Sequence, residues 1–247
     1  GSYVTGHVVC GLGLIAACVA TAVTASTRFS LIPANSADET FSVNRDGFSA
    51  GRVALLISLV AIFALAAWIW CILLLIRGAS TPHLVAGSVM FGIACVCTSL
   101  IALVSSIARQ VRGCYTMAER RRWTGLVIGM GAAAFVMGVV LLFLYRGHPV
   151  DFVAFVLFGL ALICWSISSK VILLAKVWHA EYRLANRIPI IPVLTALICL
   201  FMAAFLFEGA LFDAKYFVPA RVLTGFGAIC FTLFSIVSIL ESGTGKR

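Results

Sequence analysis

The chain has 247 residues, of which 62% are apolar and only 11% are charged. A soluble domain of this length needs far more charged surface than 18 Lys and Arg with 9 Asp and Glu provide. The composition therefore excludes a soluble enzyme, a nucleic-acid-binding module that uses the net charge of +9, and a disulfide-stapled secreted domain. It indicates a protein that lives in a lipid bilayer.

Seven long apolar runs with few or no charges follow one another along the chain. Backbone polar groups must be paired internally where there is no water, so such runs predict membrane-spanning helices. Each run is long enough to cross a hydrocarbon core of about 30 Å at about 1.5 Å per residue. The expected spans are 4–24, 53–76, 84–107, 123–145, 152–174, 190–212 and 217–240.

One longer loop, 25–52, connects the first two spans, and the other connections are short. Short connections impose antiparallel packing between neighbouring helices. The first run could be interpreted as a signal peptide, because the small-residue sequence Val23-Thr24-Ala25 follows it, but no basic segment precedes it. We therefore expect one all-α bundle of seven transmembrane helices over residues 1–247, with this run as its first helix.

Basic residues in the predicted loops give the orientation, because short cytoplasmic loops are enriched in Lys and Arg. With seven spans, 4 of the 18 basic residues fall on the side of the N-terminus and 14 on the other side. We therefore expect the N-terminus outside and the C-terminus inside, in a plasma membrane or a mitochondrial inner membrane. Two inner clusters are expected to contact anionic lipid headgroups or a protein partner. They comprise Arg109, Arg112, Arg120, Arg121, Arg122, Lys170, Lys176, Arg183 and Arg187.

Small residues recur on the first and fourth spans. Membrane helices associate mainly through close packing of small residues and a few hydrogen bonds. Gly6 and Gly13 belong to a smooth stripe on the first span, and Gly125 and Gly129 form a G-x-x-x-G pair on the fourth. We interpret these glycines chiefly as packing sites within the bundle, with specific dimerisation as the alternative.

Glu208 is the acid that lies clearly inside a predicted span, and Arg221 lies at a similar depth in the next span. A charge inside a membrane is costly without a partner. Because the link between these spans is short, we expect an intramembrane ion pair between Glu208 and Arg221. A proton- or cation-handling role for Glu208 is the alternative.

A weaker polar cluster is expected at the outer side, where imidazoles and carboxylates are competent metal ligands. Its members are His7, His83, His148, Asp151 and Asp213. No close pair such as H-x-x-H occurs, so hydrogen bonding to loop carbonyls is the simpler interpretation, and we expect no metal site. The nine cysteines lie mostly inside spans and are interpreted as small apolar packing residues.

No catalytic constellation or cofactor-binding motif stands out, so we expect no catalytic residues and no cofactor, but bound lipid. The leading hypothesis is a structural or assembly subunit of a larger membrane complex that acts through helix packing. The second is a channel or a small-solute or proton-coupled transporter that uses Glu208 and the hydroxyl faces of the third and seventh spans. The third is a membrane enzyme acting on lipid. A nucleic-acid partner is not expected.

Overall fold

All the regular structure in the described residues is helical. The computed structural model describes the backbone of residues 2–28, 50–77, 80–111, 116–148, 150–178 and 190–244. Side-chain environments are described for residues 3–22, 51, 54–77, 80–109, 116–148, 150–172 and 190–232. The helices are α1 (Ser2–Arg28), α2 (Ala50–Ile76), α3 (Thr81–Val111), α4 (Met117–Leu144), α5 (Val153–Trp178), α6 (Ile190–Gly209) and α7 (Phe217–Thr244), with the 3-10 helix η3 (Ala214–Tyr216) before α7.

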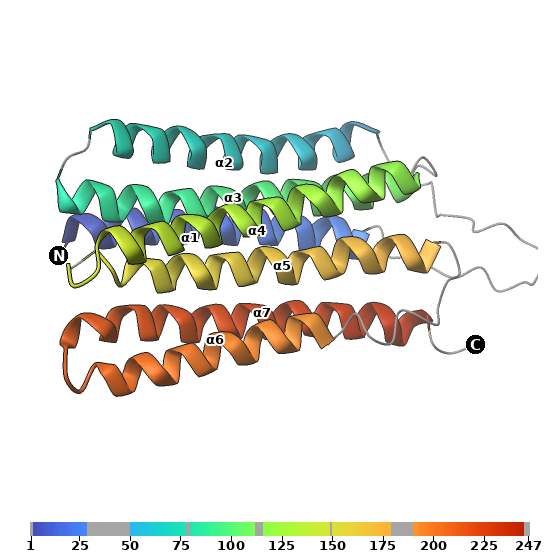
Figure 1. The fold of residues 1–247 in the computed structure, drawn as a ribbon. Coiled ribbons are helices and arrows are strands. Elements are labelled where there is room, and N and C mark those ends of the chain that lie inside the picture. Colours follow the sequence, from blue (N-terminus) through green and yellow to red (C-terminus); the bar gives the residue numbers. More distant parts are fainter. Residues whose placement is uncertain are drawn as a thin grey trace, which may run out of the picture.

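The helices lie side by side, and consecutive helices run in opposite directions (Figure 1). As a result α1, α3, α5 and α7 all begin at one end of the bundle, which we call the N-terminal end. The ends of α2, α4 and α6 lie at the same end, with the described residues of the links that follow them. The chain between α1 and α2, which holds most of the predicted loop 25–52, lies outside the described residues.

Six helices, α1 to α6, contain a stretch that is long and apolar enough to cross a membrane. In α7 side chains are described only for residues 217–232, a segment shorter than the 18 residues that a membrane span requires. The prediction of an all-helical membrane protein is confirmed by these helices. The seventh membrane crossing and the outward orientation of the N-terminus stay predictions.

The sixth span ends earlier than expected. α6 stops at Gly209 instead of continuing to residue 212, because the chain turns there, with the backbone N–H of Phe212 and of Asp213 each donating to the carbonyl of Gly209 at 3.0 Å. Asp213 then starts η3 by accepting a hydrogen bond from the backbone N–H of Lys215 at 3.1 Å. The link between α6 and α7 is therefore longer than the sequence suggested.

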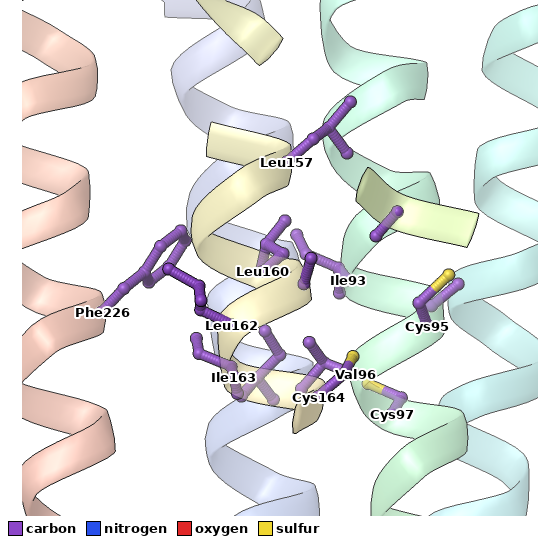
Figure 2. Packing of buried hydrophobic residues seen from close by; sticks show 14 of the residues in the cluster. Ile93, Cys95, Val96, Cys97, Leu157, Leu160, Leu162, Ile163, Cys164 and Phe226 are labelled. Atoms are coloured by element: carbon purple, nitrogen blue, oxygen red, sulfur yellow. The ribbon is translucent and has the colours of Figure 1, made fainter. Parts of the chain in front are cut away.

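α3 and α5 form the centre of the bundle. In each of them 78% of an 18-residue apolar window is buried, compared with 22 to 33% of the same length in α1, α2, α4 and α6. α3 packs against α1, α2, α4 and α5, while α5 also packs against α6 and α7. In Figure 2, Ile93 of α3 lies next to Leu160 of α5, and Phe226 points from α7 toward α5.

Glycines permit the closest approaches between these helices, but they are not the glycines that the sequence suggested. A Cβ atom added at Gly92 of α3 would lie 2.5 Å from Cδ1 of Leu160, and one added at Gly159 of α5 would lie 2.5 Å from Cδ2 of Phe226. These contacts fix the α3–α5 and α5–α7 crossings. The crossings therefore have no room for a side chain at either position.

The four glycines expected to pack helices within the bundle do not do so. Gly6 and Gly13 on α1, and Gly125 and Gly129 on α4, are exposed, and nothing lies within 4 Å of a Cβ atom added at any of them. The expectation of packing within the bundle is wrong for all four, because the helices are rotated so that these residues point outward. The inward face of α4 is instead formed by Gly131 and Gly138, which lie against α5.

Candidate functional site

The closest arrangement of opposite charges at the N-terminal end lies where the α4–α5 and α6–α7 links meet. Asp151 comes just before α5, and its side chain is only 8% exposed. Nζ of Lys215, in η3, lies 3.2 Å from Oδ2 of Asp151 and 3.4 Å from Oδ2 of Asp213. Lys215 therefore bridges a buried and an exposed carboxylate and connects the two links.

Local backbone geometry places Asp151 for this contact. Gly147 has a φ of 81°, in the left-handed region that favours glycine. This turn directs the N–H of Gly147 at Oδ2 of Asp151, at 3.3 Å. Oδ2 thus accepts two hydrogen bonds, whereas Oδ1 is buried and has no partner among the described residues.

The environment of Lys215 favours its charged form. Burial lowers the pKa of the ammonium group, but the hydrogen bond and the negative charge of Asp151 raise it by more, and Tyr216 adds to the rise. Nζ also lies 4.9 Å from the centroid of the Tyr216 ring. The pKa of Lys215 is therefore above its ordinary value, and the Lys215 ammonium is charged at neutral pH.

The expected ion pair between Glu208 and Arg221 is a wrong prediction for this structure. Both residues are exposed, and neither is paired with an opposite charge in the part of the chain that the structure describes. The guanidinium of Arg221 lies over the ring of Phe217, 4.1 Å from its centroid. The residue of α6 that faces this ring is Phe207, with centroids 5.9 Å apart. Because neighbouring helix residues are rotated by about 100°, Glu208 is turned away.

The predicted outer-side polar cluster divides into two groups. His7 and His83 belong to an aromatic group rather than to the acid–lysine bridge. His7 accepts a hydrogen bond at Nδ1 from Nε1 of Trp70, at 3.0 Å. The ring centroid of Tyr3 lies 4.5 Å from that of His7 and 5.3 Å from that of His83. Nδ1 of His83 in turn forms a hydrogen bond with Oγ of Ser80. This group connects the N-terminal ends of α1 and α3 with the end of α2.

His148 belongs to neither group closely. It lies in the α4–α5 link, with its ring centroid 6.5 Å from that of Tyr145. Within the described ranges, no three His, Cys, Asp or Glu side chains lie together in a way that could hold a metal ion. Asp151 and Asp213 are brought together by Lys215, a residue that the sequence reasoning did not select. The sequence did contain a signal for Lys215. It is a cation in the short α6–α7 link, and Asp151 is an acid in the short α4–α5 link at the same end of the bundle.

The predicted inner basic residues are described only in part. Arg109, near the end of α3, pairs with Glu119, and Glu119 together with Thr116 forms the capping box that starts α4. Lys170 is buried on α5, with 6% of its surface exposed. Arg120, Arg121 and Arg122 lie in the first turns of α4 and are partly or fully exposed. Outside the described residues or side chains lie Arg112, Lys176, Arg183 and Arg187.

The hydroxyl faces expected on the third and seventh spans do not converge on a shared path in the described segments. Thr98 of α3 donates to the carbonyl of Ala94, four positions earlier, at 2.8 Å. Thr224 and Thr232 of α7 do the same, at 3.0 Å each, and both are exposed. These hydroxyls are satisfied by their own helices.

Comparison with known proteins agrees with this membrane architecture. The family described as "Protein of unknown function (DUF2776)" matches residues 1–245. The chain belongs to this family. Over 246 residues it is 44% identical to the Inner membrane protein YhiM of Escherichia coli (strain K12), a match that covers 99% of this chain and 70% of the relative. No solved structure matches. The chain is thus an integral, multi-pass membrane protein, and nothing in the family match supports the mitochondrial alternative.

Proposed function

We propose that the protein is a non-catalytic subunit of a larger inner-membrane complex, and that it docks a partner transmembrane helix on the outward face of α4. The inner-membrane location follows the name of its relative in Escherichia coli. The observation that carries the proposal is the open G-x-x-x-G pair. Gly125 and Gly129 are exposed, with nothing within 4 Å of an added Cβ atom at either position.

α4 has small residues on two faces, and only one of them is covered in the described chain. On the covered face, a Cβ atom added at Gly131 would lie 2.4 Å from Nε1 of Trp165, and one added at Gly138 would lie 2.7 Å from Cε1 of Phe158. That face shows how α4 packs closely against a neighbour. On the outward face, Gly125 and Gly129 leave open space beside the exposed Ile128, where a helix from another chain could approach closely.

Bulky apolar side chains are exposed on other outward faces of the bundle, and also on α4 beyond Gly129, where Phe135, Val136 and Val140 are exposed. α2 and α6 carry bulky side chains toward the outside, which suit contact with lipid tails. They are Leu55, Ile62, Leu65, Ile69 and Ile72 on α2, and Leu194, Leu197, Phe201 and Phe205 on α6. Lipid contact alone does not require glycines, so the small-residue face on α4 favours a docking role. The exposed Gly6 and Gly13 give α1 a second face of this kind.

The rival hypotheses have less support. A transport path that uses Glu208 and the hydroxyls of the seventh span would need these groups to face a shared interior. Glu208 is exposed near the end of α6, however, and Thr224 and Thr232 of α7 are exposed as well. An enzyme that acts on lipid would need the histidines and acids to converge. The described members are divided between the aromatic group and the Lys215 bridge.

The test compares two Gly→Leu variants at open positions, in protein extracted from its native membrane with a mild detergent. Gly129→Leu fills the docking face, whereas Gly225→Leu adds the same side chain at an exposed site on α7 that has nothing within 4 Å. We expect the wild type and Gly225→Leu to keep the mass of a complex, and Gly129→Leu to dissociate into the single chain. A wild type that is monomeric, or a Gly129→Leu variant that keeps its complex, would rule out the proposal.

A further inference from the structure

An apolar groove lies in the N-terminal half of the bundle. Its volume is about 510 Å³, within the range of about 300 to 1,000 Å³ that is typical of small-molecule sites. Packing contacts run in turn from α1 to α3, α5 and α7, so α1 and α7 form the walls and α3 and α5 form the floor. Ile93, Leu160 and Phe226 line its inner part, and Figure 2 shows Ile93 beside Leu160.

The groove has the depth of one leaflet of a bilayer. Its lining covers residues 4–12 of α1 and 218–226 of α7, a rise of about 12 Å at about 1.5 Å per residue. The hydrocarbon core of one leaflet is about 15 Å thick. Because all four lining helices begin at the N-terminal end, the groove belongs to the leaflet at that end.

The lining selects a hydrocarbon occupant. Apart from Thr5 and Thr81, every lining side chain is apolar. Both threonines lie at the N-terminal end of the groove, close to the expected headgroup level. A polar ligand buried beyond them would lose its hydrogen bonds to water without replacement.

Arg221 is the charged residue of α7 nearest in sequence to this groove. It is not a lining residue, but it lies between the lining residues Val218 and Val222, and its guanidinium lies over the ring of Phe217, one turn nearer the start of α7. The Arg221 side chain is exposed, and no described carboxylate pairs with it. A guanidinium near a helix end can reach the headgroup region and bind phosphate oxygens through two parallel hydrogen bonds.

We propose that this groove binds one acyl chain of a phospholipid whose phosphate lies beside Arg221. The site uses α1, α3, α5 and α7, whereas the docking face of the proposed complex lies on α4. The two proposals therefore stand on different residues, and either can fail without the other.

The first arm of the test fills the groove. Leu12 lines it, and Leu65 is an exposed leucine on α2. The purified protein is titrated with dioleoyl phosphatidylglycerol and the bound lipid is counted by native mass spectrometry. We expect wild type and Leu65→Trp to retain one tightly bound lipid and Leu12→Trp to lose it. The proposal is overturned by a wild type without such a lipid, or by equal retention in the two variants.

The second arm removes the proposed phosphate contact without changing the groove. Arg221→Gln is compared with Arg77→Gln, which removes an exposed arginine after α2 at the same end of the bundle. We expect Arg221→Gln to weaken binding of the tightly bound lipid about fivefold, equivalent to about 1 kcal/mol. Arg77→Gln is expected to leave that affinity unchanged. Equal affinities in the two variants would overturn the assignment of the phosphate to Arg221.

Discussion

Nζ of Lys215 lies 3.2 Å from Oδ2 of Asp151, and this contact joins the α4–α5 hairpin to the α6–α7 hairpin. Asp151 is nearly buried, while Asp213, the second acid on Lys215, is half exposed. The two carboxylates therefore contribute unequally, because exposed ion pairs stabilise little and a buried group left without its partner is costly.

The first prediction concerns the different contributions of Asp151 and Asp213 to stability. Asp151→Asn should lower the free energy of unfolding by about 1 to 3 kcal/mol, since it leaves a partly buried ammonium without its main partner. Asp213→Asn should change the same quantity by less than about 1 kcal/mol. Thermal unfolding of both variants in the same detergent measures the difference. Equal losses of stability would show that burial does not distinguish the two acids.

The second prediction concerns pH. The pKa of Lys215 is raised in the folded protein by Asp151, so folding favours the protonated ammonium. Its contribution to stability is complete below the unfolded lysine pKa of about 10.4 and is lost as the pH rises through the higher folded value. The difference in melting temperature between wild type and Lys215→Met should therefore be constant at neutral pH and shrink in strong alkali. A difference that does not depend on pH would contradict the charged bridge.

A third prediction concerns the helix crossings. Gly159→Ala on α5 places a methyl group 2.5 Å from Cδ2 of Phe226 on α7. Gly225→Ala, on the partner helix α7, places its methyl group where no atom lies within 4 Å. Overpacking should cost about 1 to 3 kcal/mol at Gly159. Gly225→Ala should be neutral or stabilise by up to about 1 kcal/mol. Unfolding measurements on the two variants provide the check, and a neutral Gly159→Ala would argue against the close α5–α7 crossing.

A fourth prediction concerns the aromatic group. Loss of the hydrogen bond from Nε1 of Trp70 to Nδ1 of His7 should couple α1 less firmly to α2. In a double-mutant cycle of Trp70→Phe and His7→Phe, we expect a coupling energy of about 0.5 to 1.5 kcal/mol. The paired change Trp68→Phe with His7→Phe is the control, because Trp68 donates to Thr98 instead. Additive effects in the first cycle would mean that the hydrogen bond does not stabilise the fold.

The presence of the helices was predictable from the sequence, whereas their rotation was not. A bilayer demands long apolar runs, so the runs predicted α1 to α6 directly. Lipid tails are as apolar as leucine, however, so hydropathy does not distinguish a face that touches lipid from one that touches protein. For this reason Gly125 and Gly129 were not separable in advance from Gly131, which lies on the covered face of the same helix.

The contacts of the charged residues were also not predictable, because they too depend on how each helix is rotated. Depth along the chain correctly placed Glu208 and Arg221 near one end, but pairing also depends on rotation, which changes by about 100° per residue. The structure turns Phe207 toward α7 instead. Asp151 and Lys215 are far apart in the sequence, and their contact depends on how the two hairpins pack, which no local pattern encodes.

The docking face of α4 is the central claim, and photocrosslinking in intact cells tests it most directly. A photoreactive amino acid replaces Ile128, an exposed residue beside Gly129, or Ile62, an exposed isoleucine on α2. Ile128 should give a discrete adduct with a protein of defined mass, and Ile62 should give none because it faces lipid. The claim is contradicted if Ile128 yields no protein adduct, or if both positions give the same products.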